Sequence, residues 1–383
     1  MSFGHLKSSP SRRVAIVGAG AIGLSIGWRL AAAGCSVDIF DRGAAGQGAT
    51  RAAGGMLAAA AEVEPAEDAL VALCRRSQAM WADFAAELEA ASGIDVELRR
   101  EGTLVIALTA DDLGKLRRTA ELQQRLGIGT RWLPGGEVRR IEPYLSPRVS
   151  GALHCPDDHQ VENRKVGAAL ARAYQAAGGR LHEHVAVEGI ATTDGRVLGL
   201  RIGDGLHEAD TVVVAAGAWS RGLGGLPDGL RPPVRPVKGQ MLALRMPSGE
   251  PLLRHVLWTP GAYLIPRRDG RLLIGATVEE RGFDENLTAG GLLSLLESAW
   301  RAVPGIEELP VEETWVGFRP GSRDDAPILG PGGIAGLVMA TGHHRNGILL
   351  TPATAELVAR HVLTGEVDPA MAPFGIDRFS RTR

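Results

Sequence analysis

The chain has 383 residues, 45% of them hydrophobic, so it can bury a large core, and its length predicts two domains or one large domain with an inserted layer. Lysine and arginine (42) nearly balance aspartate and glutamate (44), with a pI near 6.6, so we expect a small-molecule partner and no nucleic acid. Three widely spaced cysteines form no disulfide framework, and no uncharged run is long enough to cross a membrane, which predicts a soluble, cytoplasmic protein without a membrane partner.

The first pattern in the chain is strand–turn–helix–strand, and it follows a polar segment (residues 1–11) that we expect to be disordered. RRVAIVGAG holds a short β-branched run that is typical of a buried parallel strand. AIGLSIGWRLAAAG predicts a helix that ends at Gly34, a residue suited to the left-handed turn after a helix. SVDIFDR predicts the second strand.

The remaining segments are of two kinds, those with predicted helices and short strands and those with longer strand-like runs. Helical spacing of apolar residues predicts helices over 65–92, 110–126 and VENRKVGAALARAYQAAGG, with a strand in LRREGTLVIAL. Residues 235–321 carry longer strand-like runs, which favour an antiparallel sheet with one helix at 288–303. GLVMATG then predicts a strand, and ILLTPATAELVARHVLTG a helix ended by Gly365. The two kinds of segment interleave along the chain, so we expect discontinuous domains.

Gly18-Ala-Gly20-Ala-Ile-Gly23 fits the G-x-G-x-x-G motif, and it lies between a predicted strand and a predicted helix. In a dinucleotide site Gly18 permits the tight turn, Gly20 admits a pyrophosphate at the helix N-terminus, and Gly23 allows close helix–strand contact. Asp41 ends the second strand, where a carboxylate accepts hydrogen bonds from ribose hydroxyls, and its charge disfavours the 2′-phosphate of NADP. The alternative interpretation is an ordinary glycine-rich turn.

The residues after Asp41 distinguish between NAD and FAD. RGAAGQGATRAAGGMLAAAAE contains mostly small residues, whereas a simple NAD dehydrogenase usually continues with regular β–α units. Backbone can approach a large planar ligand where side chains are absent, so this segment favours a flavin lying deep against the chain. A flexible loop is the alternative.

The chain resembles a known family, the FAD-dependent amine and D-amino acid oxidoreductases, and within it the glycine oxidases of thiamine biosynthesis. The motifs that carry the resemblance are ATRAAGGMLA, VVVAAGAWS, VKGQ, YLIPR, WVGFRPGSRDDAPILG and GHHRNGILLTPAT. With the element order, the resemblance implies an α/β fold. In that fold we expect two discontinuous domains that interleave along the chain. They are a Rossmann-type FAD-binding domain (12–62, 150–234 and 322–376) and an α+β substrate domain built on an antiparallel sheet (63–149 and 235–321).

The same resemblance implies residue roles for FAD, held without a covalent link. Ala21 and Ile22 meet the pyrophosphate, Asp41 and Arg42 the adenosine side, and Val185 presents its backbone to the adenine. The other implied cofactor contacts, including the segment around the pyrimidine edge of the flavin, are Ala49, Thr50, Gly54, Gly55, Met56, Gly217, His343, His344, Arg345, Asn346, Gly347, Ile348 and Leu349.

For the substrate, the resemblance implies that Arg319 binds the carboxylate, with Tyr263 and Arg345 beside it. Arginine suits this task because its planar fork makes two parallel hydrogen bonds to a carboxylate. A surface or core-lining arginine is the alternative for Arg319. We expect Lys238 to be an exposed charge, and a place near the flavin is the alternative for it. No general base is required if the amine binds uncharged and hydride passes from Cα to flavin N5, leaving an imino acid that water hydrolyses.

Two other site classes are disfavoured. His343 and His344 are adjacent in a turn, so their side chains diverge, and no third ligand cluster lies near them in sequence, so we expect no metal. A Ser–His–Asp hydrolase would need a nucleophile elbow, and no G-x-S-x-G is present.

Three functions stay open. The first is an oxidase that converts glycine or another small amino acid, with oxygen, to the 2-oxo acid, ammonia and hydrogen peroxide. The second is an amino acid dehydrogenase that passes electrons to a quinone or a partner protein, and the third a non-catalytic flavoprotein subunit. Gly261 and Val278 are small where glycine oxidases carry bulkier side chains, which favours room for sarcosine or D-alanine. A homo-oligomer also stays open.

Overall fold

The predicted strand–turn–helix–strand unit is confirmed. The computed structural model describes residues 12–65 and 67–380, so the N-terminal segment expected to be disordered lies outside the described residues. Strand β1 (Arg13–Val17) leads through the glycine-rich turn into helix α1 (Ala21–Ala32), and strand β2 (Ser36–Phe40) pairs with β1 in parallel. Gly34 follows the helix at φ +89°, the left-handed conformation expected there.

Around this unit lies a six-stranded sheet of the Rossmann type. Its order is β18-β19-β12-β1-β2-β8, and it adds β8 (Arg180–His182), β12 (Thr211–Val214), β18 (Ile328–Pro331) and β19 (Leu337–Thr341). All pairs are parallel except β18 with β19. Helices α1, α6 (Asn163–Ala176) and α8 (Thr351–Thr364) pack together, and α8 ends at Gly365 in the left-handed conformation, as predicted.

The second sheet has eight strands in the order β17-β13-β16-β15-β14-β4-β6-β5. Its two long strands, β13 (Arg235–Arg245) and β17 (Val311–Gly321), pair antiparallel, and only β14 with β4 is parallel. The antiparallel sheet predicted over 235–321 is therefore confirmed. The other members are β4 (Thr103–Ala107), β5 (Arg131–Pro134), β6 (Gly151–Cys155), β14 (Val256–Trp258), β15 (Tyr263–Pro266) and β16 (Arg271–Gly275).

The other elements connect or cover the sheets. Strands β9 (Gly189–Thr193), β10 (Arg196–Ile202) and β11 (Gly205–Glu208) form a small antiparallel sheet, and β3 (Met56–Leu57) pairs with β7 (His159–Gln160). No helix among the described residues is long and apolar enough to cross a bilayer. The remaining helices are α2 (Ala49–Ala52), α3 (Asp68–Ser92), α4 (Ala110–Arg125), α5 (Gly135–Ile141) and α7 (Ala289–Ala302), with short 3-10 helices at 217–222, 228–230, 304–308, 344–346, 369–374 and 376–379.

Two elements pack with the domain other than the one to which their sequence segments were assigned. Helix α3 belongs by sequence to the predicted substrate segment 63–149, yet it packs against α6 and α8, and its Trp81 and Leu88 share one buried cluster with Leu24 of α1. Strand β6 belongs to the predicted FAD-binding segment 150–234, yet it lies in the eight-stranded sheet between β4 and β5. The amphipathic pattern of α3 predicted a buried face, but it carried no information about which core would cover that face.

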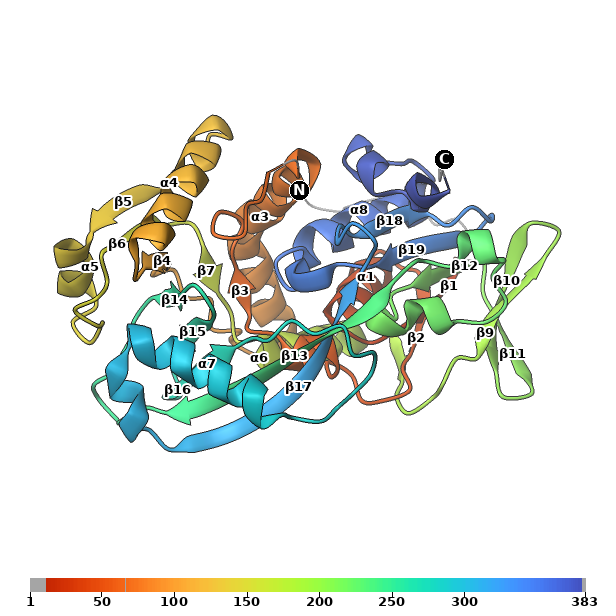
Figure 1. Ribbon diagram of the computed structural model, residues 1–383. Helices are drawn as coiled ribbons and strands as arrows, with labels where there is room; N and C mark the ends of the chain where they lie inside the picture. Colours follow the sequence, from red (N-terminus) through yellow and green to blue (C-terminus); the bar gives the residue numbers. More distant parts are fainter. Residues whose placement is uncertain (1–11, 66, 381–383) are drawn as a thin grey trace.

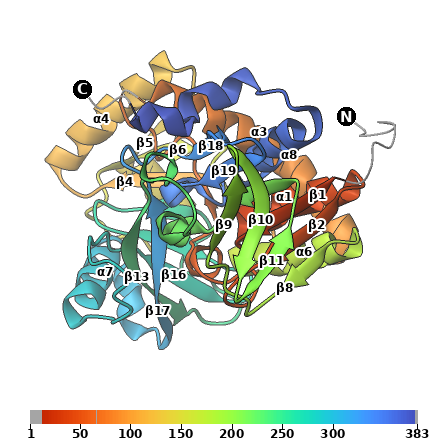
Figure 2. The same ribbon diagram turned by 90° about the vertical axis from the view of Figure 1, so that its right-hand side faces the viewer.

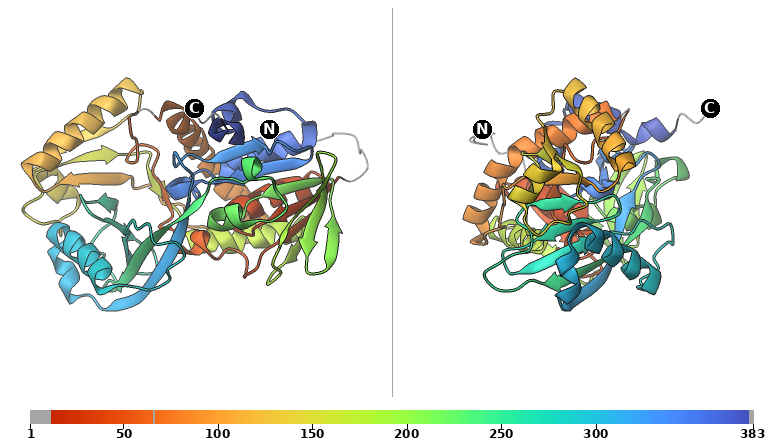
Figure 3. Two further views of the ribbon diagram at one scale, coloured as in Figure 1. Left: turned by 45° about the vertical axis from the view of Figure 1, so that its right-hand side comes forward. Right: turned by 60° about the vertical axis from the view of Figure 1, so that its left-hand side comes forward.

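The views show how the two sheets meet. In Figure 1 the six-stranded sheet and its helices lie to the right, and the eight-stranded sheet with α4, α5 and α7 lies to the left. Figure 2 brings β9, β10 and β11 to the front, against the six-stranded sheet. In the left view of Figure 3, the long strands β13 and β17 run from the eight-stranded sheet on the left toward the six-stranded sheet. These long strands therefore carry residues of the second sheet to the carboxyl ends of β1 and β2.

Candidate active site

A cavity of about 950 Å³ is lined by residues of both sheets. Its walls come from the glycine-rich turn, from residues 40–56, 185–187 and 215–223, and from the substrate-side segments 258–263, 275–278, 317–320 and 340–348. In open α/β sheets ligands bind outside the carboxyl ends of the strands, where the turn after β1 lies. The position and size suit a large cofactor together with a small substrate.

The glycine-rich turn has the geometry that a pyrophosphate requires. Gly18 has φ +108°, and an added Cβ would lie 2.4 Å from Ala215 O. A Cβ on Gly23 would lie 1.9 Å from Gly18 O, so this glycine lets the helix approach the turn. A Cβ on Gly20 would meet only Thr50 Oγ1, at 3.3 Å, and Gly20 lines the cavity. The backbone at Gly18 and Gly23 leaves no space for a side chain, and a turn of this geometry fits a dinucleotide.

Asp41 braces this turn from the end of β2. Its Oδ2 accepts a hydrogen bond from Ala19 N at 2.8 Å, and its Oδ1 accepts one from Gly43 N at 2.8 Å. Asp41 also lines the cavity, and its predicted contact with the ribose stays a prediction. The Thr50 hydroxyl accepts from Ala21 N at 2.9 Å, next to the positive end of the helix dipole.

Most residues predicted to hold the cofactor line this one cavity. Three do not: Gly23, Asn346 and Leu349. Leu349 is buried, and its carbonyl accepts hydrogen bonds from Ser77 Oγ at 2.6 Å and Trp81 Nε1 at 2.9 Å, so it anchors α3. The predicted residues that do line the cavity are Gly18, Gly20, Ala21, Ile22, Asp41, Arg42, Ala49, Thr50, Gly54, Gly55, Met56, Val185, Gly217, His343, His344, Arg345, Gly347 and Ile348.

The adjacent histidines have different partners, as expected for neighbours in a turn. His343 Nε2 lies 3.1 Å from Thr354 Oγ1 of α8, and burial lowers the pKa of His343 to about 3, so its ring is neutral. His344 has φ +46°, and its Nδ1 lies 3.8 Å from Asp325 Oδ2. Burial lowers the pKa of His344 to about 4 despite Asp325.

Arg319 and Tyr263 lie close together at the cavity wall. Arg319 Nη1 donates to Thr277 O at 3.1 Å, and among residues 12–65 and 67–380 no carboxylate lies within ion-pair distance of it. Burial raises the pKa of Tyr263, and the nearby Arg319 opposes that shift. Both residues line the cavity. A guanidinium without a carboxylate, beside a neutral phenol, is a preformed site for one anion.

Arg345 also lines the cavity, but its charge is already paired. Its Nε lies 2.9 Å from Glu62 Oε2, an ion pair without hydrogen-bond geometry, and its Nη2 donates to Glu64 Oε1 at 2.6 Å. Burial lowers the pKa of Arg345, but the two carboxylates outweigh burial and leave it raised. Burial raises the pKa of Glu62 to about 7, although Arg345 opposes the shift. Arg345 thus lines the cavity with its charge already paired.

Lys238 is a correction to the sequence prediction. Its side chain is 0% exposed, where an exposed charge was expected. Lys238 Nζ donates to Asp284 Oδ2 at 2.7 Å and to Asn286 O at 2.6 Å, so it holds the loop that follows β16. The ammonium is buried because β13 is covered on both faces and the loop supplies its acceptors.

Several cavity residues were missed. Glu62 ends the small-residue segment that follows Asp41, and a charged residue among small apolar ones could have marked it as a cavity residue. Trp219 receives the Arg42 guanidinium over its ring at 4.2 Å and stacks on Phe283 at 5.0 Å. Phe318, next to Arg319, packs edge-on against Phe283 at 5.3 Å. These aromatic residues come from distant segments, so no local spacing predicts their contact.

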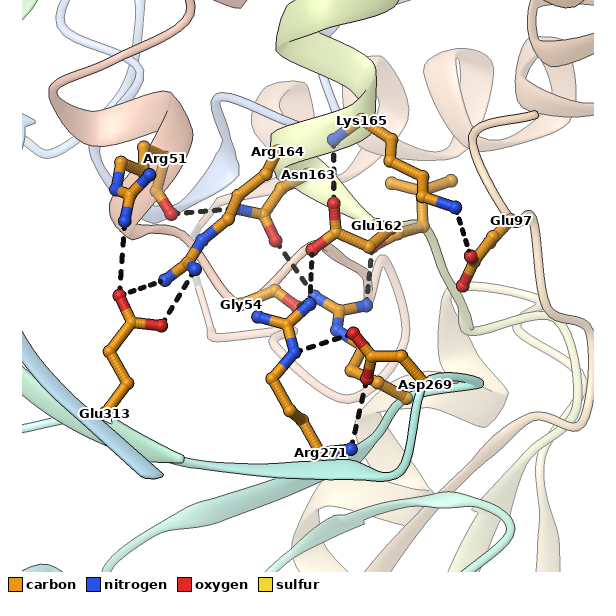
Figure 4. A network of polar contacts seen from close by, with 12 residues as sticks. Arg51, Gly54, Glu97, Glu162, Asn163, Arg164, Lys165, Asp269, Arg271 and Glu313 are labelled. Carbon is orange, nitrogen blue, oxygen red and sulfur yellow. Dashed lines mark hydrogen bonds and ion pairs between the residues drawn. The ribbon is translucent and has the colours of Figure 1, made fainter. Parts of the chain in front are cut away.

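A network of charged and polar side chains, shown in Figure 4, joins elements of the two sheets next to Gly54. Arg51 of α2 and Arg164 of α6 both pair with Glu313 of β17, at 3.2 and 2.8 Å. The buried Arg267 donates to Gly54 O at 2.8 Å. Partly buried pairs of this kind hold geometry more than they add stability. Gly54 and Gly55 line the cavity, and the Arg267 hydrogen bond holds the Gly54 carbonyl there.

Comparison with known proteins agrees with this geometry. The family model described as FAD dependent oxidoreductase matches residues 13–361. The chain is 39% identical to the glycine oxidase of Geobacillus kaustophilus over 369 residues, which are 95% of this chain and 96% of that protein. It is 35% identical over 374 residues to the bifunctional protein ThiO/ThiG of Trichormus variabilis, matching 97% of this chain and 56% of that protein, so it spans about half the length of that relative.

A solved structure supports the same assignment. The crystal structure of glycine oxidase from Geobacillus kaustophilus has a TM-score of 0.90 and 37% identity to this chain, and the match covers 97% of this chain and 99% of that chain. The glycine-rich turn, the Asp41 brace and the cavity beyond them all fit FAD. The chain therefore belongs to the family of FAD-dependent oxidoreductases.

Proposed function

We propose that the protein oxidises small amino acids, namely glycine, sarcosine and D-alanine, with oxygen as the electron acceptor. Glycine, water and oxygen yield glyoxylate, ammonia and hydrogen peroxide, and sarcosine releases methylamine instead of ammonia. The observation that carries the proposal is Arg319, an arginine without a carboxylate partner among the described residues, which faces the cavity beside Tyr263. The similarity to glycine oxidases supports the substrate class.

The side chains hold the substrate and leave its oxidation to the cofactor. The Arg319 fork and the Tyr263 hydroxyl bind the carboxylate, and each charge-assisted hydrogen bond contributes about 1.5–3 kcal/mol. Bound FAD supplies the group that accepts two electrons from the substrate. The amine is uncharged when it is oxidised, because its ammonium proton passes to solvent as the substrate binds, and the protein orients the Cα–H bond by fixing the carboxylate.

The proposal includes substrates slightly larger than glycine. Gly261 lines it, and an added Cβ there would lie 2.9 Å from Ser298 Oγ, so a larger residue at this position would have to displace Ser298. Val278 also lines the cavity and is 72% exposed, so it stands at the opening. The added Cβ on Gly261 would point toward Ser298 of α7, so the support for an N-methyl or Cα-methyl group on the substrate comes from Val278 at the opening.

A substrate panel tests the proposal. The FAD-loaded protein is mixed with glycine, sarcosine, D-alanine and L-alanine, and oxygen uptake, hydrogen peroxide and reduction of an artificial dye are followed in parallel. We expect peroxide in proportion to oxygen consumed for the first three. Dye reduction with negligible peroxide would instead identify a dehydrogenase, and inactivity with every amine a non-catalytic flavoprotein. Either result would overturn the oxidase proposal.

A further inference from the structure

Two arginines line the proposed substrate side of the cavity, and they differ in whether a carboxylate pairs with them. Arg319 has a backbone carbonyl as its hydrogen-bond acceptor and no carboxylate partner among residues 12–65 and 67–380. Arg345 lies between two carboxylates, Glu62 on the cavity side and Glu64 toward solvent. The Glu62 side chain is 11% exposed and that of Glu64 is 56% exposed. Solvent therefore screens Glu64 much more than Glu62.

The segment that carries Glu62 is held firmly. The buried Asp158 accepts hydrogen bonds from Ala60 N at 3.0 Å and from Ala61 N at 2.7 Å, directly before Glu62. The Gln78 amide donates to the same carboxylate at 2.9 Å. These hydrogen bonds fix the backbone up to Ala61, and each is costly to leave unmade, so the Glu62 side chain starts from a fixed position beside Arg345.

We propose that Glu62 is a specificity-determining residue that restricts the substrate to a single carboxylate, because it occupies Arg345 and leaves Arg319 as the one anion site. The inference rests on the proposed function and adds the substrate class to it. A substrate with a second carboxylate would find Arg345 neutralised and would bring a negative charge toward Glu62. Neutral substituents on the amine meet no such repulsion.

The size of this discrimination follows from electrostatics. Two unit charges of like sign about 5 Å apart, at an effective dielectric constant of about 20, disfavour binding by roughly 300-fold. Partial protonation of Glu62, whose pKa burial raises to about 7, reduces the effect near neutral pH. We therefore expect a change of at least about tenfold in relative affinity when the Glu62 charge is removed.

Two unreactive acids test the inference by binding alone. Pentanoate is the carbon analogue of N-ethylglycine, and glutarate is the carbon analogue of iminodiacetate, which adds a second carboxylate. Their dissociation constants are measured for the FAD-loaded protein at pH 8 from the change in flavin absorbance. The wild type is expected to prefer pentanoate, and Glu62→Gln to shift the ratio of dissociation constants at least about tenfold toward glutarate.

Matched variants make the result specific. Glu62→Leu carries the same prediction and replaces Glu62→Gln if that variant folds poorly. Glu64→Gln removes a carboxylate from the same guanidinium but on the exposed side, so it should shift the ratio less. An unchanged ratio in both Glu62 variants, an equal shift in Glu64→Gln, or a wild type that already prefers glutarate would overturn the inference. A wild type that binds neither acid would instead contradict the proposed carboxylate site at Arg319, and with it the proposed function.

Discussion

Gly239→Ala tests the position of the Arg319 guanidinium without changing any charge. Gly239 lies in β13 directly opposite Gly317 of β17. An added Cβ would lie 2.6 Å from Arg319 Nη1 and 2.9 Å from Nη2. Carbon and nitrogen atoms in contact prefer about 3.5 Å, so the end of the flexible arginine must move by roughly 1 Å. The strand backbone itself accepts alanine.

A displacement of about 1 Å in a substrate-positioning group costs up to about 100-fold. We therefore expect the KM for glycine to rise about 10- to 100-fold, with FAD binding unchanged. Steady-state peroxide release at varied glycine concentration gives the KM, and the flavin content of the purified protein gives FAD binding. Gly136→Ala is the control, because its added Cβ would meet nothing within 4 Å. An unchanged KM in fully FAD-loaded Gly239→Ala would refute the placement of Arg319 at the substrate.

Three further outcomes are expected. Arg319→Met removes two charge-assisted hydrogen bonds of about 1.5–3 kcal/mol each, so the KM for glycine in the same assay should rise about 10²- to 10⁴-fold with FAD retained; a normal KM would exclude the carboxylate role. His343 is neutral when folded because burial lowers its pKa to about 3, so stability is lost as pH falls below the unfolded value of about 6.5. Urea unfolding measures how much the free energy of unfolding falls between pH 7 and pH 5, and in His343→Asn this fall should be smaller than in the wild type by about 2 kcal/mol. An equal fall in both proteins would contradict a buried neutral ring. Lys238→Met keeps the buried volume but releases Asp284, so limited proteolysis should cut the loop at 276–287 faster; an unchanged cleavage rate would show that Lys238 does not hold it.

Much of the cofactor end of the site could be predicted because its determinants are local. Gly18, Gly23 and Asp41 act through the turn that contains them or through the strand beside it, and the motif spacing encodes that geometry. The antiparallel sheet was also predictable, because the runs that form β13 and β17 are long and strand-like. These elements depend little on the rest of the chain.

The errors arose where distant segments meet. Lys238 is buried because a loop some 46 residues later supplies Asp284 as its partner. The pairing of Arg345 with Glu62 joins residues far apart in the chain, so the sequence showed two charges but not their neutralisation. Helix α3 was predicted correctly as a helix and assigned to the other core, because periodicity reveals a buried face without its partner.

Anaerobic reduction of the bound flavin by glycine tests the proposed function most directly. With oxygen excluded, adding glycine to the FAD-loaded protein should bleach the flavin absorbance band. The same concentration added to Arg319→Met should leave most of the band in place, and admitting oxygen to the wild type should restore it. A band that persists in the wild type with glycine, sarcosine and D-alanine alike would contradict amino acid oxidation at this site.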